Sequence, residues 1–238
     1  MKKLFVVLIL SIMCIIPCSV NAQSKSYRTV AGVVVDKTLY DKMCELYSTH
    51  YVETLSQEEF DNLASKDLDN AIKVEYVEDT SNNRGSYFAS GSKAVSFIKS
   101  GDWVTLIADW FVVPSVHSFD VMAFRMSGCS LVGNVTFRQT YVSSGNLYYV
   151  HNGNDKYFTN GFGTSALLQY GTDNEFTLTF RVSGSGTIYG TYQHATSTIS
   201  LADSMNYTLS SGGFGKVLNF GTVGHSIYDR MTGVVISF

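Results

Sequence analysis

Proline is nearly absent from this sequence of 238 residues, which holds only Pro17 and Pro114. Cysteine is also scarce, and the four cysteines form no CxxC pair, no Cys/His run and no zinc-ligand spacing. The five histidines are scattered, with no pair two or four positions apart. Because transition-metal sites need clustered ligands, we predict no metal site and no metal cofactor.

Other functional patterns are missing as well. No G-x-S-x-G motif indicates a nucleophile elbow, and no basic stripe indicates a nucleic-acid surface. Beyond the N-terminus, no apolar run reaches the ~20 residues that a membrane-spanning helix needs. We therefore predict no catalytic residue, no cofactor, no nucleic-acid partner and no stable membrane span.

The N-terminus has the three parts of a secretory signal. Lys2 and Lys3 are followed by the apolar core Leu4–Ile16, and Val20-Asn21-Ala22 provides a small-residue cleavage site. We expect residues 1–22 to be a cleaved signal peptide and the mature chain to be secreted. The Met1-Lys2-Lys3 start is typical of a bacterial protein.

Cleavage removes Cys14 and Cys18, which leaves Cys44 and Cys129. Two cysteines in an exported chain permit one disulfide, which would tie the N-terminal region to the domain that follows. The alternative is two unrelated small apolar side chains.

Charge divides the remaining chain in two. Residues 31–80 carry 12 acidic and 4 basic residues, a net charge of −8, whereas residues 81–238 carry 8 and 9, a net charge of +1. We predict an acidic helical arm with a first strand at 23–80, and an antiparallel β domain at 81–238.

The arm shows two helical patterns. Leu39, Met43 and Leu46 make an apolar stripe in a helix over 38–48. Ser56–Glu59 is a capping box, flanked by Leu55 and Phe60 as a hydrophobic staple, and predicts a second helix ending near Ser65. We expect these helices to pack on the β domain, and a strand to follow at 72–76. The packing residues are Leu39, Met43, Leu46, Phe60 and Leu63.

Three strand-length segments, 102–114, 119–128 and 130–142, lie back to back and hold both tryptophans. Alternation of apolar and polar residues in the third segment is typical of a strand with one buried face. The first segment is apolar on both faces, which favours a central strand. We interpret the three as the middle of one antiparallel sheet.

Later turn signals recur about every eight to twelve residues, as in a sandwich. Asn152-Gly153 and Asn160-Gly161 predict hairpins, and so does Gly184-Ser185-Gly186 between strands at 176–182 and 188–194. Shorter strands are expected at 199–201, 207–209, 217–220 and 234–238. The fold class is mostly β, an antiparallel β-sandwich or jelly-roll-like domain with a short N-terminal two-helix arm. The expected shared core is Leu106, Trp110, Val135, Phe137, Leu178, Phe180 and Ile236.

The segment Tyr148–Phe162, expected to form a hairpin, gathers aromatic, amide and carboxylate side chains that could bind a ligand. The plainer interpretation is strand tyrosines and turn chemistry. His151–Asp155 distantly resembles a calcium loop but lacks the following glutamate. The candidate binding residues are Tyr149, His151, Asn152, Asn154, Asp155, Tyr157 and Asn160.

Asp109 is a carboxylate in the middle of a predicted strand. A buried carboxylate must be paired or protonated. We favour an ion pair with Arg125 or Arg138 over a pocket carboxylate of raised pKa.

These features favour a secreted, non-enzymatic β-sandwich that binds an extracellular ligand, either a glycan or a surface protein. Two alternatives stay open. One is a secreted carbohydrate-active hydrolase that uses Asp109 and a loop carboxylate. The other is a β pore-forming protein, because the segment 175–201 is rich in Ser and Thr and poor in charge.

Overall fold

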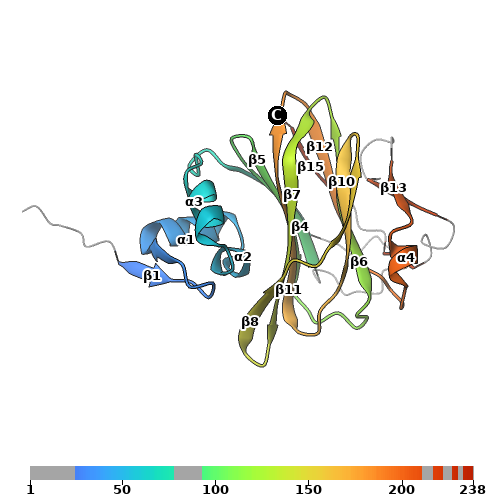
Figure 1. The fold of residues 1–238 in the computed structure, drawn as a ribbon, viewed down its shortest axis with the longest axis horizontal. Coiled ribbons are helices and arrows are strands. Elements are labelled where there is room, and N and C mark those ends of the chain that lie inside the picture. Colours follow the sequence, from blue (N-terminus) through green and yellow to red (C-terminus); the bar gives the residue numbers. More distant parts are fainter. Residues whose placement is uncertain (1–24, 78–92, 211–216, 222–226, 230–232, 238) are drawn as a thin grey trace, which may run out of the picture.

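The computed structural model describes residues 25–77, 93–210, 217–221, 227–229 and 233–237, so the expected signal peptide lies outside the described residues. Four layers follow one another across the molecule in Figure 1: a helical arm, two β-sheets, and an outer layer that contains α4 and β13. The predicted fold class, an antiparallel β-sandwich with an N-terminal helical arm, is confirmed.

The first sheet has six strands and carries the arm on its outer face. Its order is β3-β4-β5-β11-β7-β8, so β5 is central, as its two apolar faces predict. All of its pairings are antiparallel. The strands are β3 (Ile72–Val77), β4 (Lys93–Ser100), β5 (Trp103–Trp110), β7 (Ser130–Ser143), β8 (Asn146–Val150) and β11 (Thr172–Ser183).

The second sheet has five strands in the order β15-β12-β6-β10-β9. The three segments of 102–142 do form strands, but the prediction that they share one sheet is wrong, because β6 pairs with β10 and β12. Alternation shows which side chains point inward and does not show which sheet a strand joins. The strands are β6 (Phe119–Ser127), β9 (Asn154–Phe158), β10 (Gly161–Leu167), β12 (Thr187–Gln193) and β15 (Val234–Ser237).

The main core lies between the two sheets. All seven residues expected to share it belong to one cluster, with Leu106, Leu178 and Phe180 fully enclosed. Phe124 and Phe180 stack across it at a ring distance of 3.8 Å. Apolar side chains on facing strands therefore provide the main stabilisation of the sandwich.

Two expected hairpins are crossings between the sheets instead. β8 and β9 lie in different sheets, and so do β11 and β12. At the first crossing a Cβ on Gly153 would lie 2.4 Å from Thr164 Oγ1 and 2.8 Å from Phe137 Cδ1. Glycine is needed there for close passage rather than for a tight hairpin turn. Asn160-Gly161 does end a hairpin, in which Gly161 pairs with Phe158.

The arm contains a small hairpin and three short helices, so the prediction of a two-helix arm is wrong in its number of helices. The hairpin is β1 (Ser26–Arg28) with β2 (Val34–Asp36), and the helices are α1 (Lys37–Leu46), α2 (Thr49–Glu53) and α3 (Gln57–Ala64). The predicted first helix over 38–48 is too long, because Tyr47 is extended and Ser48 caps α2. The capping box of α3 is present as predicted.

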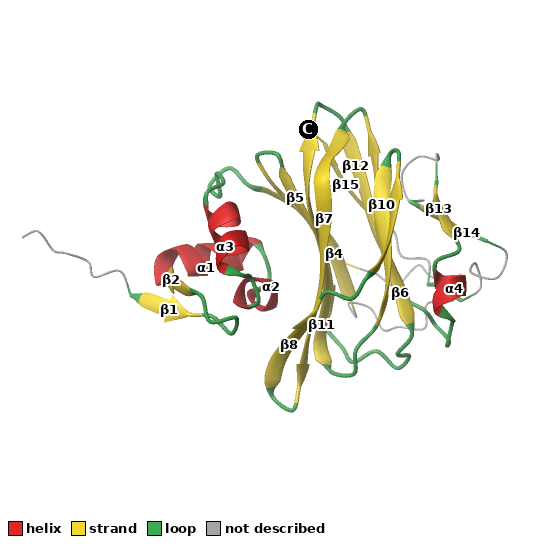
Figure 2. Cartoon of the chain, in the orientation of Figure 1, coloured by secondary structure: helices red, strands yellow, loops and turns green. Residues whose placement is uncertain are grey.

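The arm packs on the outer face of the six-stranded sheet (Figure 2). Met43, Phe60 and Leu63 are buried in a cluster that includes Ile98 of β4 and Ile107 of β5, and Leu39 and Leu46 pack at its margin. The expected packing residues are therefore confirmed. This second core holds α3 close to β5, β7 and β11.

The outer layer on the five-stranded sheet is formed by α4 (Leu201–Ser204), β13 (Tyr207–Leu209) and β14 (Leu218–Phe220). The predicted strand at 199–201 is wrong. Ser200 accepts a hydrogen bond from the Asp203 backbone N–H, and this cap starts a helix at Leu201.

Candidate functional site

A cleft of about 360 Å³ opens between helix α3 and the outer face of the six-stranded sheet. We call it the arm–sheet cleft. The arm contributes one wall and the sheet the other, so residues far apart in the sequence meet there. It is lined by Tyr51, Ser56, Glu58, Glu59, Asn62, Leu63, Trp103, Thr136 and Thr179.

Strand alternation and helix capping explain why these side chains face the cleft. On the six-stranded sheet, Thr136 and Thr179 are direct partners, and both point away from the core that holds Phe137 and Phe180. On the arm side, the Ser56 hydroxyl accepts from the Glu59 backbone N–H, and the Glu59 carboxylate accepts from the Ser56 backbone N–H. This capping box fixes where α3 begins.

An ion pair joins the two walls. Arg138 Nη2 of β7 donates to Glu59 Oε2 at 2.7 Å, and the Arg138 side chain is only 3% exposed. Burial opposes ionisation of Glu59, but the Arg138 guanidinium and the Ser56 backbone N–H outweigh it and hold the pKa of Glu59 below its ordinary value. Glu59 therefore stays charged and serves as a structural clamp.

Tyr51 of α2 forms the floor near this clamp. Its hydroxyl lies 2.8 Å from Thr179 Oγ1, and the Arg138 guanidinium lies 5.4 Å from its ring centroid. Burial raises the pKa of Tyr51 to about 12. The phenol therefore stays protonated at neutral pH and acts as an anchor between arm and sheet.

Trp103, the first residue of β5, forms the aromatic wall. The Lys66 ammonium and the Arg181 guanidinium lie 5.4 and 5.7 Å from its ring centroid. Arg181 is held in turn by Asp102 at 2.6 Å. The indole Nε1 of Trp103 is buried and has no hydrogen-bond partner within the part of the chain that the structure describes.

The opening of the cleft carries polar side chains that can reach a ligand. Ser56, Glu58, Asn62 and Thr136 are exposed. Glu58 lies in the first turn of α3, and Asn62 follows one turn later on the same helix face. Together they present a carboxylate, an amide and hydroxyl groups beside an indole ring.

Two of the residues predicted to bind a ligand adjoin this cleft. Tyr149 of β8 is the direct partner of Thr140, so it points to the same outer face as the cleft. The Arg138 guanidinium lies 5.8 Å from its ring centroid. His151 packs against Tyr149 edge-on at 5.7 Å and has Nδ1 2.9 Å from Phe137 O.

The other predicted binding residues lie on different surfaces. Tyr157 faces the open edge between the sheets, where its hydroxyl accepts a hydrogen bond from the Val135 backbone N–H. Asp155 is paired with Thr164, and burial raises its pKa. Asn154 donates to a β10 carbonyl, Asn152 lies in the sheet crossing, and Asn160 lies in the β9–β10 turn. The structure therefore does not bring the seven residues together.

Asp109 does not form the expected ion pair, since Arg138 is paired with Glu59 and Arg125 lies in the other sheet. Its direct partner across the sheet is Glu175. Burial, together with the negative charges of Asp173 and Glu75, raises the pKa of Asp109 to about 6. Burial, together with the negative charge of Asp109, raises the pKa of Glu175 to about 8. Glu175 is fully enclosed beneath the arm, so a substrate cannot reach both carboxylates.

Cys44 and Cys129 are free, so of the two alternatives left open by the sequence the disulfide is not formed. Cys44 packs in the arm cluster, whereas Cys129 packs against the core between the sheets. Within the described residues, no group of three His, Cys, Asp or Glu side chains could hold a metal ion. None of the helices in the described part of the chain is long and apolar enough to cross a membrane.

The sequence did not indicate the cleft because its two walls are far apart along the chain. Two signals were visible, namely the capping box that contains Glu59 and the polar face of β7 that contains Arg138. Neither shows that the two side chains meet. Trp103 had been assigned only to a strand-rich stretch.

Comparison with known proteins gives little further guidance. No protein-family model matches the sequence, and no curated protein matches it. Among solved structures, the crystal structure of ACE19, the collagen binding subdomain of the Enterococcus faecalis surface protein ACE, is similar over 40% of this chain and 77% of that chain. The sequence identity is 12% and the TM-score is 0.31. Function is therefore inferred from the geometry of the cleft alone.

Proposed function

We propose that this protein is an extracellular binding module that takes a short saccharide in the arm–sheet cleft. The observation that carries the proposal is the lining of the cleft, where the Trp103 indole stands beside Glu58, Asn62 and Thr136. Aromatic rings contact the apolar faces of sugars, and amide and carboxylate groups orient sugar hydroxyls.

The size and the rigidity of the cleft agree with this use. A volume of about 360 Å³ lies at the lower end of the range for small-molecule sites, ~300–1,000 Å³. Glu59 and Tyr51 are already engaged in contacts between arm and sheet, so they position the walls. Glu58 and Asn62, in contrast, are exposed and make no side-chain hydrogen bond within the described residues, which leaves them available to a ligand.

A saccharide fits this lining better than a hydrolysis site fits the Asp109–Glu175 pair. Glycoside hydrolysis needs two carboxylates that both face the substrate. Because Glu175 is enclosed, that pair lacks access, whereas the cleft is open on one side. The geometry therefore favours binding without cleavage.

The test is binding of the labelled mature chain to a glycan array that includes cell-surface and cell-wall saccharides. For a saccharide that binds, we expect the double variant Glu58→Ala/Asn62→Ala to weaken binding at least tenfold. Tyr170→Ala is the matched control, because Tyr170 is 76% exposed and does not line the cleft. Tyr149→Ala should have an intermediate effect if the site extends past Arg138.

Tryptophan fluorescence provides an independent readout. Trp103 lines the cleft, whereas Trp110 is enclosed in the core. Saccharide addition should change the emission of the wild-type chain and leave that of Trp103→Phe unchanged. Binding that survives the double variant, or no binding to any saccharide, would contradict the proposal.

A further inference from the structure

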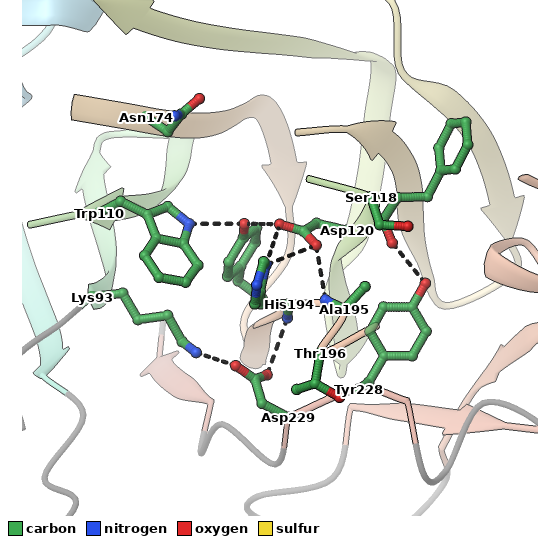
Figure 3. A network of polar contacts seen from close by, with 12 residues as sticks. Lys93, Trp110, Ser118, Asp120, Asn174, His194, Ala195, Thr196, Tyr228 and Asp229 are labelled. Atoms are coloured by element: carbon green, nitrogen blue, oxygen red, sulfur yellow. Dashed lines mark hydrogen bonds and ion pairs between the residues drawn. The ribbon is translucent and has the colours of Figure 1, made fainter. Parts of the chain in front are cut away.

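A buried network of polar side chains lies at one end of the sandwich and connects its two sheets (Figure 3). It is separate from the arm–sheet cleft. Lys93 is the first residue of β4, Asp120 lies near the start of β6, and His194 directly follows β12. The network consists of Lys93, Trp110, Asp120, Tyr192, His194 and Asp229.

The pair of interest within it is Lys93 and Asp229. Lys93 Nζ is in direct contact with Asp229 Oδ2, and the two side chains are only 1% and 5% exposed. The Trp110 ring covers the ammonium, with its centroid 5.2 Å from Nζ. A primary amine and a carboxyl group are thus held together with little access to bulk water.

The other oxygen of Asp229 is held separately. Oδ1 accepts a hydrogen bond from the His194 backbone N–H at 3.0 Å. That part of the backbone is fixed by Asp120, which accepts from the Ala195 backbone N–H at 2.8 Å and lies 2.9 Å from His194 Nδ1. Oδ1 therefore points to a fixed donor, while Oδ2 points to Nζ.

We propose that Lys93 and Asp229 react with each other to form an amide bond between Nζ and Cγ, an internal cross-link of the chain. The reaction balances within the pair. A proton passes from Nζ to Oδ2, and the amine lone pair attacks Cγ. The Cγ–Oδ2 bond then breaks, and Oδ2 leaves as water with a second hydrogen from nitrogen. Oδ1 remains as the amide oxygen, and no outside reactant is required.

The surroundings favour each part of this step. An enclosed ion pair is costly, and burial opposes the charged form of the carboxyl group. Burial indeed raises the pKa of Asp229, against the attraction of Lys93. Negative charge develops on Oδ1 during the attack, and the His194 N–H is already placed to stabilise it. The enclosed site also limits hydrolysis of the product.

Peptide mapping of the full chain tests the bond directly. After denaturation, trypsin cleaves at Lys93 only if Nζ is free. A cross-linked chain should yield peptide 85–99 joined to peptide 217–230, with a mass lower by one water than the sum of the two. Separate peptides 85–93, 94–99 and 217–230 at full mass would overturn the proposal.

A second dehydration product has to be distinguished. A cyclic imide at Asp229 also loses one water, but it leaves Lys93 open to trypsin, so cleavage at Lys93 would overturn the proposal even with that mass loss. Lys93→Arg keeps the positive charge and should restore the full mass. Lys99→Arg on the same strand is the matched control and should keep the cross-link. If the mass loss persists in Lys93→Arg, the modification lies at other residues and the proposal is overturned.

Discussion

Trp103 and Trp110 stand at the two ends of β5 and point to opposite faces of its sheet. Trp103 lines the arm–sheet cleft, and its Nε1 has no partner among the described residues. Trp110 is 1% exposed and donates from Nε1 to the Tyr192 hydroxyl at 2.9 Å. One face of β5 thus borders the arm–sheet cleft, which is open. The other face borders the polar network around Trp110, which is closed.

The difference between these regions shows how the same residue types serve two purposes. In the closed network each carboxylate is held by several donors, so removing one group leaves the others buried and unsatisfied. In the cleft, several polar side chains are exposed and keep their bonding capacity. We expect the network to govern stability and the cleft to govern binding.

The largest expected effect is that of Asp120→Ala in the closed network. The Asp120 carboxylate accepts from Tyr192, from the Ala195 backbone N–H and is paired with His194, all fully buried. Its removal should lower the free energy of unfolding by about 3–5 kcal/mol, measured by urea denaturation. Asp69→Ala, at an exposed surface pair, is the control and should change it by less than about 1 kcal/mol. If the two variants lowered the free energy of unfolding equally, the closed network would not govern stability as we expect.

Glu175→Gln tests the arm side of the comparison through the pH dependence of the free energy of unfolding. Because burial raises the pKa of Glu175 from 4.5 to about 8, the folded chain binds a proton between these values that the unfolded chain lacks. Stability is therefore full below about pH 4.5 and falls as pH rises towards 8. At about 1.4 kcal/mol per pH unit, Glu175→Gln should stabilise the chain by a few kcal/mol at pH 8.

The measurement is thermal or urea unfolding of wild type and Glu175→Gln from pH 5 to pH 8. Glu45→Gln, at an exposed position of α1, is the control and should follow the wild-type curve. If both variants show the wild-type pH dependence, burial does not raise the pKa of Glu175 as described.

The two tryptophans should respond differently to replacement by phenylalanine. Trp110→Phe loses enclosed ring volume and the bond to Tyr192, so it should cost about 2–3 kcal/mol of stability. Trp103→Phe should cost less than about 1 kcal/mol, because Trp103 is half-buried and its Nε1 has no described partner. Circular dichroism melts would compare them, and the reverse order would reject the assignment of open and closed regions.

The smallest expected effect is that of Ser56→Ala at the start of α3. Loss of an N-cap costs about 1 kcal/mol, and the cap also positions Glu59 at Arg138. Ser65→Ala, near the other end of the helix, is the comparison variant and should cost less. We would detect both by urea denaturation, and no change in Ser56→Ala would mean that the arm is held by its apolar cluster alone.

Structural features that depend on residues close together in the sequence were predicted well. Alternation placed Val135 and Phe137 in the core, and the capping box placed the start of α3. Loop direction was not predictable, because Asn152-Gly153 has the composition of a hairpin turn but passes between sheets. The decisive factor there is close contact of Gly153 with Phe137 and Thr164, residues distant in the sequence.

The candidate site was predicted only in part for the same physical reason. Tyr149 and His151 do adjoin the cleft, yet Asp155 and Tyr157 point to other surfaces, since β9 joins the second sheet. The contact of Arg138 with Glu59 spans 79 positions. The types of the two residues do not indicate that side chains so far apart in the sequence will be in contact.

The contact of Lys93 with Asp229 spans 136 positions and therefore encloses most of the sandwich in one loop. If the chain were pulled from a point before Lys93 and a point after Asp229, a covalent link there would carry the tension. The strands between the two residues would then be spared the load and would not be drawn out. In single-molecule stretching, the wild-type chain should therefore lengthen less on unfolding than Lys93→Arg, because the strands inside the loop stay folded.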